Sequence, residues 1–562
     1  MAIKNMKTIR TSYPSIATLI ALLVALHGTF VLATTLLDQF SILRGPRLTE
    51  ITIDIPILIG VSLIYLSSLL MRRKQRAWQV AVLVYVFLLG LGVASIVHFG
   101  HRHQLDWDSL LRALCLPAGI IALLVVARDE FVVRSDMVAF RSSLKFAVIV
   151  LIIAMIYGIT GFELLDRRDF HKEFSVGEAF HRTIDQFDLT TSQPLHAYTR
   201  RARVFQDSLS VVSVAAVAYV AISLFSPLRA RYTDPAADRE RMRTLLETYG
   251  APSEDFFKLW PHDKHYFFSS DGKAGLALKV KNGVALCLGD SAGDPKAAKT
   301  ILREFEMQCY ENDWLPAVIH VEPLRAKVYA QAGYALQKIG EEAIVNIDHF
   351  ESAVANNKYF RNIRNRFNKA NYTFEVLKPP HHPDVFKRLN VVSNEWLNKP
   401  GRTERGFAMG YFSEDYIQQC IIFVARDAAG TIQAFMNQIP APFDSAEANF
   451  DMLRYASGSP SNINDYLLTN FIHAMHDDGY VRVNLGLSPL VGLGNKEEKT
   501  LLDNFLYFAY ANGDRLYSFS GLHRFKSKYE PDWSERFLAY KGGIRGVTKV
   551  TNALARIMKV EN

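Results

Sequence analysis

The sequence has little cysteine, and its cysteines are far apart. Cys115, Cys287, Cys309 and Cys420 are the only four among 562 residues, and no two of them form a CxxC pair. Zinc ribbons and disulfide-stapled secreted domains place their cysteines at short, repeated spacings. We therefore exclude both classes, and the three thiols of the C-terminal half fit a reducing compartment.

Glycine and proline are present in ordinary numbers, 32 and 21, which excludes collagen-like and low-complexity chains. The phosphate-binding motif GxxxxGK[ST] is also absent, so the sequence gives no sign of this kind of ATP site. The formal net charge is +8, which favours anionic partners. Phospholipid headgroups and nucleic acid both satisfy that condition, and the charge does not choose between them.

Long apolar runs are absent after residue 228 but frequent before it. A helix needs about 20 apolar residues to cross a bilayer. Six segments meet this length or come near it: Ser15–Leu37, Ile51–Met71, Ala77–Phe99, Leu110–Ala127, Phe146–Leu165 and Ser208–Leu228. The sequence therefore predicts a multi-pass α-helical membrane domain over residues 1–228.

The loops between these segments differ in their content of lysine and arginine. Basic residues are frequent at the N-terminus and in the second and fourth loops, and cytoplasmic loops carry such an excess. We therefore expect both termini in the cytoplasm. The fifth loop, Asp166–Gln206, is basic as well. Val176, Phe180, Ile184 and Phe187 recur there at helical spacing, which predicts a helix lying in the membrane interface.

Residues 229–562 read as two similar α/β units, 229–350 and 372–562. In each unit, short strands joined by turns such as Asp271-Gly272 and Ala429-Gly430 lead into a helix and then another strand. Such an order is typical of a mixed sheet, and its repetition predicts a tandem of two related folds.

A basic segment, residues 351–371, connects the two units. Its core reads NNKYFRNIRNRFNKAN (Asn356–Asn371), with five basic residues and no acidic one. Phe360, Ile363 and Phe367 follow helical spacing and would dock the helix on a core. Arg361, Arg364 and Lys369 are candidates for phosphate contacts. The alternative is a solvated helix face.

The second unit contains several motifs that resemble one family. They are WLNKPGRTERGFAMGYF (Trp396–Phe412), AFMNQIP (Ala434–Pro440), FDMLRYA (Phe450–Ala456), GYVRVNLGLSPLVGLG (Gly479–Gly494) and YSFSGLHRFKSKYEPDW (Tyr517–Trp533). Their order and spacing resemble the C-terminal domain of bacterial aminoacyl-phosphatidylglycerol synthases, the multiple peptide resistance factor family that includes phosphatidylglycerol lysyltransferase.

The resemblance implies a membrane domain and a cytoplasmic part of two acetyltransferase-like folds joined by a basic helix. It implies transfer of an aminoacyl group, most often lysyl, from aminoacyl-tRNA to phosphatidylglycerol in the cytoplasmic membrane of a bacterium. The cationic product lowers the negative surface charge and resists cationic antimicrobial peptides. Aminoacyl-tRNA is then the co-substrate, and neither CoA nor a metal is expected. A homo-oligomer is compatible with this expectation. Larger members have more than six spans, and their membrane domain can flip the product.

Asp451 and Arg454 are the candidate catalytic residues, for the aminoacyl ammonium and for a phosphate or carbonyl oxygen. Positions i and i+3 of a regular strand point to opposite faces, so a shared site needs a bulge or a strand end. Arg524, Lys526 and Lys528 would share one face of an extended segment and suit phosphate. Asn484 is a further substrate-binding candidate. The first unit is expected to be structural or to shape the lipid entry.

Three other functions remain open. An acetyl-CoA-dependent acyltransferase would need a glycine-rich pyrophosphate loop, whereas YASGSPS after Arg454 supplies no second glycine. A lipid flippase would leave the cytoplasmic part without activity. A transferase that uses charged tRNA on a different acceptor would share the chemistry but not the product.

Overall fold

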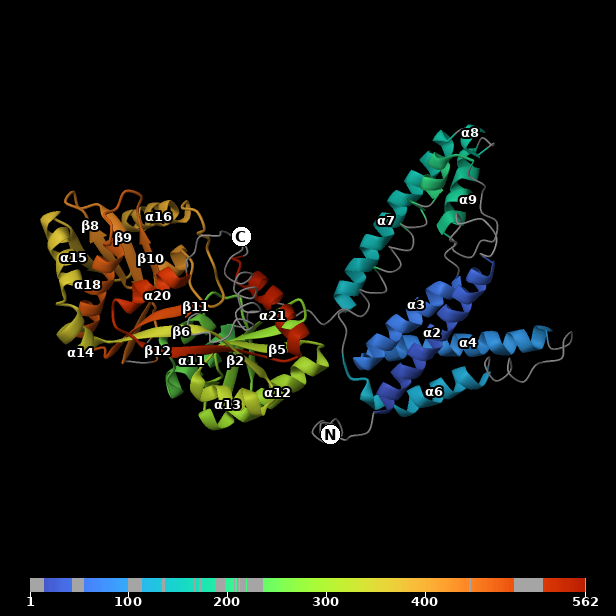
Figure 1. The fold of residues 1–562 in the computed structure, drawn as a ribbon, viewed down its shortest axis with the longest axis horizontal. Coiled ribbons are helices and arrows are strands. Elements are labelled where there is room, and N and C mark those ends of the chain that lie inside the picture. The colour runs from blue at the N-terminus through green and yellow to red at the C-terminus, as the bar shows by residue number, and fades with distance from the viewer. Residues whose placement is uncertain are drawn as a thin grey trace. The chain divides into compact units, whose positions relative to one another are not determined.

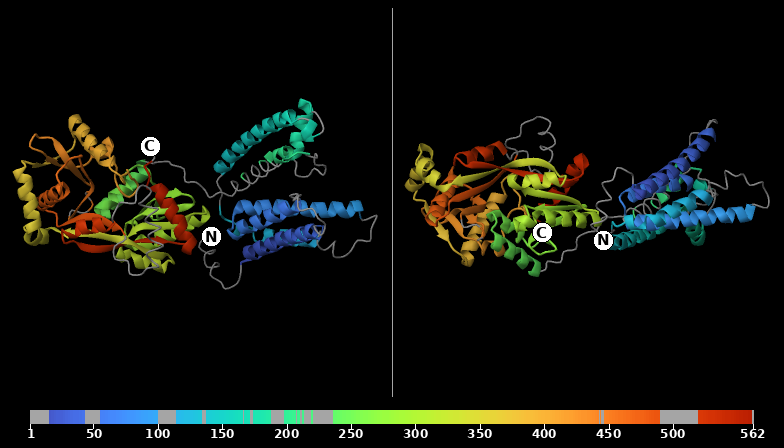
Figure 2. Two further views of the ribbon diagram at one scale, coloured as in Figure 1. Left: turned by 45° about the horizontal axis from the view of Figure 1, so that its top comes forward. Right: turned by 90° about the horizontal axis from the view of Figure 1, so that it is seen from below.

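The computed structural model describes residues 15–42, 55–99, 114–133, 137–165, 167–170, 174–187, 198–206, a few positions between 208 and 219, and 236–560 without 442, 444–445 and 490–518. It divides into two units (Figures 1 and 2). The first comprises residues 1–229 and 311–313, and the second comprises 230–310 and 314–562. Each unit is described by itself.

The N-terminal unit is helical. Its main helices are α2 (Ile16–Ile42), α3 (Ile55–Met71), α4 (Gln75–Phe99), α6 (Leu116–Val126), α7 (Met137–Leu164) and α9 (Val176–Phe187), with the short α8 (Arg167–Phe170). Five of them cover most of the first five apolar segments that the sequence predicts. The sixth, Ser208–Leu228, lies largely outside the described residues.

Small residues allow close helix packing in this unit. Gly28 of α2 and Gly60 of α3 approach so closely that a Cβ on Gly28 would lie 2.8 Å from the carbonyl oxygen of Gly60. Membrane helices pack through small residues in this way. Among the described helices, one segment, Ile16–Thr34, is long and apolar enough by itself to cross a membrane, and four shorter apolar helices accompany it.

The helix α9 has the amphipathic character that the sequence predicts. Ala179 is fully buried within the unit, whereas Val176, Phe180 and Ile184 are 63%, 42% and 40% exposed. The apolar stripe therefore faces away from the protein, as expected of a helix in the membrane interface.

The C-terminal unit contains one mixed sheet. Its strands are β1 (His265–Phe268), β2 (Ala274–Lys281), β3 (Val284–Leu288), β4 (Ala292–Gly293), β5 (Leu315–Val321), β6 (Ala335–Asn346), β7 (Thr373–Leu377), β8 (Ile422–Arg426), β9 (Ile432–Gln438), β10 (Glu447–Tyr455), β11 (Arg482–Pro489) and β12 (Asp532–Tyr540). Their order is β1-β2-β3-β5-β12-β6-β11-β10-β9-β8-β7, with β4 beside β2.

The helices of this unit are α11 (Ala236–Tyr249), α12 (Ala298–Glu311), α13 (Pro323–Gln331), α14 (Ile347–His349), α15 (Lys358–Lys369), α16 (Pro383–Leu397), α17 (Glu414–Ile417), α18 (Ile463–Asp477), α20 (Phe519–Ser527) and α21 (Gly543–Ile557). A short 3₁₀ helix, η3, covers Ser253–Lys258, another, η4, covers Pro295–Ala297, and a π-helical turn covers Phe350–Val354.

The two halves repeat one pattern. Strands β3 and β5 are parallel and flank α12, and strands β10 and β11 are parallel and flank α18. Each parallel pair follows an antiparallel hairpin, β2–β3 or β9–β10. The tandem repeat predicted from the sequence is therefore present, and the acetyltransferase-like fold stays an expectation from the family resemblance.

Alternating side chains of the strands supply two cores. In β2, Leu276 and Leu278 pack with α12 on one face, while Ala277 packs on the other face with residues of α21. This is the period of two that a doubly covered sheet requires, and Figure 1 shows α12 and α21 on opposite sides of these strands. The core on the α21 face contains residues of both halves, such as Leu286 and Phe435.

The last strand crosses the division that the sequence predicts at residue 371. β12 lies between β5 and β6 of the first half, antiparallel to both, although it comes from the segment 372–562. Strand β6 continues the sheet by pairing with β11 of the second half. The two halves therefore share strands as well as a core.

Candidate functional site

A cavity of about 560 Å³ opens in the C-terminal unit where the strands lose their regular pairing. The register shifts in β10 against β9, in β11 against β6, and in β12 against both β5 and β6. Strands β5, β6, β10 and β11 each contribute residues to the cavity wall. Such irregularities redirect side chains and are frequent beside active sites.

Asp451 and Arg454 line this cavity together. The pairing of β10 with β9 shifts between Phe450 and Leu453, so that three steps on β10 match two on β9. This bulge lets positions i and i+3 reach one site, as the sequence analysis required. The geometric condition on the two candidate catalytic residues is therefore met, and their roles stay predictions.

The carboxylate of Asp451 has an unusual environment. Its Oδ2 atom is out of contact with solvent and has no hydrogen-bond partner. Burial raises the pKa of Asp451 to about 7, although a hydrogen bond with Tyr416 and the charge of Arg454 act in the opposite direction. A carboxyl group with a pKa near neutrality can gain or lose a proton at little cost. Position 410 has no room for a side chain, because a Cβ on Gly410 would collide with Asp451 Oδ2.

Arg454 is already engaged by an acidic side chain. Its two terminal nitrogens donate to Glu404 Oε1 and Oε2 at 2.8 and 2.7 Å, and one also donates to Ser393 Oγ at 2.6 Å. The guanidinium carbon lies 5.0 Å from the ring centre of Trp396. The side chain of Arg454 is therefore held in place at the cavity wall. Because its terminal nitrogens donate to Glu404 and Ser393, fewer donors are available for a substrate oxygen than the sequence predicted.

Lys526 lines the cavity, whereas Asn484, which the sequence offered as a substrate-binding candidate, is buried and does not line it. The ammonium of Lys526 donates to the carbonyl oxygens of Gly486 and Leu487 at 2.8 and 2.9 Å, which occupies two of its three donors. Burial lowers the pKa of Lys526 to about 7, and the nearby Glu342 acts against that change. The amide nitrogen of Asn484 lies 3.3 Å from Glu342 Oε2. Asn484 therefore supports Glu342, which does line the cavity.

The expectation that Arg524, Lys526 and Lys528 share one extended face is wrong. The segment begins as helix α20, in which Arg524 is exposed and Lys526 is buried. Lys528 follows the helix and donates to Asp465 Oδ1 at 2.7 Å and to the Tyr359 hydroxyl at 2.8 Å. The ion pair with Asp465 explains the position of Lys528 without a phosphate.

The basic helix is α15, and its apolar side docks as predicted. Phe360, Ile363 and Phe367 are buried, whereas Arg361, Arg364 and Lys369 are exposed. Another basic residue, Arg366, is bound to Ser461 and Asn462. The three candidate phosphate contacts thus lie on the solvent side of α15, and no acidic residue lies within the helix.

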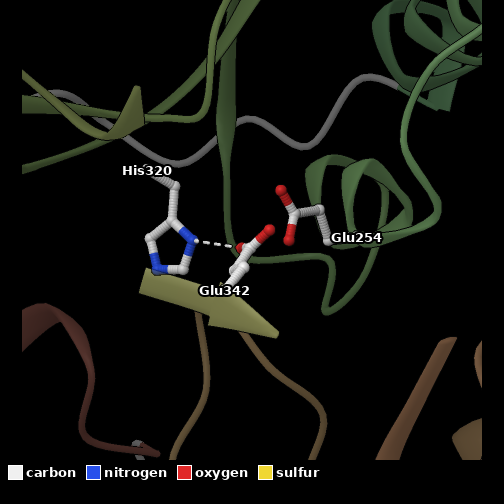
Figure 3. Close-up of side chains that lie close together, drawn as sticks. All are labelled: Glu254, His320 and Glu342. Carbon is white, nitrogen blue, oxygen red and sulfur yellow. Dashed lines mark ion pairs between the residues drawn. The ribbon is translucent and has the colours of Figure 1, made fainter. Parts of the chain in front are cut away.

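The first half contributes residues to the cavity that no sequence pattern predicts. Glu254 of η3, His320 of β5 and Glu342 of β6 line the same cavity as Asp451 and Arg454. Figure 3 shows the two carboxyl groups facing each other beside the imidazole ring. These residues are scattered over 89 positions of ordinary strand and turn sequence, so no local pattern marks them. The first half is therefore part of the cavity wall.

The acidic pair has a clear electrostatic asymmetry. Glu342 is fully buried, and its Oε2 atom lies 2.5 Å from Arg536. Although burial acts in the opposite direction, His320 and Arg536 hold the pKa of Glu342 down at about 2. Burial, followed by the charge of Glu342, raises the pKa of Glu254 well above its ordinary value. One of the two carboxyl groups therefore keeps a proton when the cavity holds no other cation.

Comparisons with known proteins place this cavity in a defined family. The family model described as phosphatidylglycerol lysyltransferase, C-terminal, matches residues 243–540. A second model, the transmembrane region of lysyl-tRNA synthetase, matches residues 10–166. The first match spans the sheet and every wall residue of the cavity named above. The chain therefore belongs to the phosphatidylglycerol lysyltransferase family, and its N-terminal part is a membrane region.

Relatives and solved structures agree with this assignment. The phosphatidylglycerol lysyltransferase of Bacillus subtilis is 27% identical over 488 residues, which cover 85% of this chain and 52% of that protein. The chain thus spans about half the length of this relative. The structure of L-PGS from Bacillus licheniformis is 30% identical with a TM-score of 0.51, and the match covers 58% of this chain and 99% of that one. The C-terminal domain of a putative lysylphosphatidylglycerol synthetase from Agrobacterium fabrum is 26% identical, with a TM-score of 0.50 and coverage of 57% and 96%.

Proposed function

We propose that this protein transfers a lysyl group from lysyl-tRNA to a glycerol hydroxyl of phosphatidylglycerol. The observation that carries the proposal is that Asp451, Arg454 and Lys526 line one cavity in a chain of this family. The product is a cationic lipid, which lowers the negative charge of the membrane surface and resists cationic antimicrobial peptides.

The reaction exchanges one ester for another. The aminoacyl carbonyl carbon forms a bond to the glycerol oxygen and loses its bond to the ribose oxygen, and the glycerol proton ends on that ribose oxygen. An aminoacyl ester is already activated, so the protein must align two substrates and stabilise an oxyanion. We propose that Asp451 Oδ2 holds the α-ammonium and that the third donor of Lys526 contacts a substrate oxygen. Arg454, fixed by its ion pair with Glu404, contributes positive charge beside these two contacts.

The N-terminal unit supports a multi-pass position in the cytoplasmic membrane. Large apolar side chains on α2, α4 and α7 are exposed, among them Leu26, Leu83 and Ile156 at 65%, 68% and 61%. Exposed apolar surface of this extent on several helices suits a lipid environment better than water. We propose six crossings, with the C-terminal unit in the cytoplasm.

The exposed basic residues of α15 are proposed as the contact for phosphate. Arg361, Arg364 and Lys369 suit either lipid headgroups or the acceptor arm of the tRNA, both of which are polyanions. Aminoacyl-tRNA is the proposed co-substrate, and CoA and a metal are not part of the proposed chemistry. A homo-oligomer stays a prediction of the sequence analysis.

The test is the lipid content of a bacterium that makes phosphatidylglycerol but no aminoacyl lipid. Mass spectrometry of its lipid extract should detect lysyl-phosphatidylglycerol when the full chain is expressed, and should not detect it with Asp451→Asn. Membranes from the same cells should form the product from added lysyl-tRNA without CoA. The proposal fails if no charged tRNA yields an aminoacyl lipid although the protein is present in the membrane.

A further inference from the structure

The exposed face of the last helix, α21, carries charge of one sign. Its polar positions follow one another in steps of four, three and four residues and therefore share one face: Arg545, Lys549, Asn552 and Arg556. The opposite face is buried on the sheet through residues such as Leu554. Residues 541–560 contain no acidic side chain. We call Arg545, Lys549 and Arg556, all three of which are exposed, the basic stripe of α21.

Folding alone does not account for the basic stripe. Arg545 lies in the first turn of α21, where the helix dipole disfavours a cation, and it is four residues from Lys549, a spacing at which like charges repel. Within the described part of the chain, no carboxylate forms an ion pair with the stripe, and Arg556 donates to Asn282 Oδ1 at 3.3 Å. On the other side of the same strands, α12 mixes two basic residues with three glutamates. The excess of one sign is therefore particular to α21, and it favours an anionic partner.

The C-terminal end of α21 meets the wall of the cavity. The backbone nitrogen of Gly406 donates to the carbonyl oxygen of Met558 at 3.0 Å, and Arg405 pairs with Lys559 in an isolated antiparallel bridge. Arg405 lines the cavity. At a rise of about 1.5 Å per residue, the basic stripe is about 16 Å long and runs towards this contact. A polyanion that lies along the stripe therefore has one end at the cavity.

The composition of this face favours the backbone of duplex RNA over other polyanions. The exposed residues that the structure describes in α21 are Gly543, Arg545, Thr548, Lys549, Asn552 and Arg556. None is aromatic, whereas surfaces for single-stranded RNA stack the bases on aromatic side chains. None is a large apolar residue, whereas helices that lie on a membrane insert such residues below the headgroups. Arginine, lysine and asparagine contact phosphate and sugar, and A-form RNA is recognised through those groups.

We propose that Arg545, Lys549 and Arg556 bind the sugar-phosphate backbone of the duplex acceptor arm of the tRNA and so direct its aminoacylated end to the cavity. This inference rests on the proposed function and adds the surface on which the donor lies. The three side chains are positioning residues, because they lie outside the cavity and do not line it. The surface is distinct from α15, which packs on α18, whereas α21 covers β3 and β12 at the other end of the sheet (Figure 1).

The test measures how the full chain in detergent binds an uncharged RNA hairpin with the sequence of the acceptor arm of a lysine tRNA. Fluorescence anisotropy at several KCl concentrations gives the binding constant and its salt dependence. Replacing the three stripe residues together with glutamine should weaken hairpin binding roughly tenfold or more. The slope of log K against log salt should fall in magnitude by about 2, because each lost phosphate contact removes about 0.7–0.9. Arg545→Lys with Arg556→Lys should keep most of the binding, since lysine also binds phosphate through its charge.

The matched control replaces Lys296, Lys299 and Arg303 with glutamine. These exposed residues lie on or just before α12, on the other side of the same strands, so the net charge changes equally. This variant should bind the hairpin as the unaltered chain does. A single-stranded RNA of the same length should bind more weakly and respond little to the stripe. In membranes, loss of the stripe should raise the KM for lysyl-tRNA more than it lowers kcat.

The outcomes separate the inference from the proposed function. Unchanged hairpin binding without the stripe, or equal weakening in the α12 control, would overturn the inference. A higher KM for phosphatidylglycerol, with the KM for lysyl-tRNA unchanged, would overturn it in favour of a lipid surface. If the unaltered chain forms no aminoacyl lipid while hairpin binding still depends on the stripe, the transfer reaction fails and the RNA surface stands. If lipid product forms but the stripe has no effect on the hairpin, the surface alone fails.

Discussion

The buried carboxylate of Asp451 lowers the stability of the fold when it is ionised. Its pKa is raised to about 7 from an ordinary value of 3.8, so the folded state holds this proton more tightly than the unfolded state. Between those two values the folded chain binds more protons, and its stability falls as the pH rises through this window. Above about pH 7 the full penalty is present. Residues that serve catalysis often carry such a cost.

We therefore predict that Asp451→Asn stabilises the fold while abolishing transfer. The neutral amide removes the charge that burial disfavours, so the gain over the unaltered chain should be small near pH 4 and larger at pH 8. Thermal unfolding at both pH values and lysyl transfer in membranes measure the two effects. Equal stability differences at both pH values would show that Asp451 is not protonated in the folded state, and normal transfer would remove it from the active site.

Arg454 differs from Asp451 because it is buried with a partner. Arg454→Ala leaves Glu404 without its cation, and breaking a buried ion pair costs about 3–5 kcal/mol. We predict that this variant loses transfer and also unfolds at lower urea. The double variant Arg454→Met, Glu404→Gln removes both charges and should recover most of the stability. If it also recovers transfer, Arg454 has only a structural role.

The helix α15 has one buried apolar face and one exposed basic face. Three aromatic or aliphatic residues bury one side, and Arg361, Arg364 and Lys369 occupy the other. We predict that replacing these three basic residues with glutamine weakens binding of tRNA or anionic vesicles. The slope of log K against log salt should fall in magnitude by about 2, because each lost phosphate contact removes about 0.7–0.9.

The matched control for this prediction lies in the first half. Lys296, Lys299 and Arg303 are exposed basic residues on or just before α12, so their replacement with glutamine changes the net charge equally. A reduced slope in the α15 variant alone supports a phosphate site there. If both variants change binding equally, the effect is one of overall charge, and α15 is a solvated connector.

At the scale of elements, the sequence predicts the order of strands and helices along the chain well, because hydrophobic periodicity and turn residues depend only on neighbouring positions. The hairpin turns at Asp271-Gly272 and Ala429-Gly430 both lie where the sequence places them. Which strands pair across the sheet is not a local property. The insertion of β12 between β5 and β6 depends on contacts nearly 200 residues apart, and no pattern in Asp532–Tyr540 indicates it. The grouping of Glu254, His320 and Glu342 was not predicted for the same reason. The same strand, β12, brings Arg536 to Glu342.

At the scale of the whole molecule, the proposed reaction sets a condition on topology. Aminoacyl-tRNA is found in the cytoplasm, so the C-terminal unit with its cavity must face that side. Six crossings place the N-terminus there too, whereas five would place it outside. The positions of the two ends therefore test different statements: the C-terminus tests access to tRNA, and the N-terminus tests the number of spans.

We predict that reporters fused at either end report a cytoplasmic position. A fluorescent protein that folds only in the cytoplasm should be bright at residue 562 and before residue 1, and alkaline phosphatase at the same points should be inactive. A fusion in the loop between the first and second apolar segments, near residue 46, should show the reverse and serves as the internal control, because an odd-numbered loop is expected outside. Alkaline phosphatase active at residue 562 would exclude tRNA as the donor. Activity only at the N-terminus would instead mean that one of the six segments, with Ser208–Leu228 as the first to examine, does not cross the membrane.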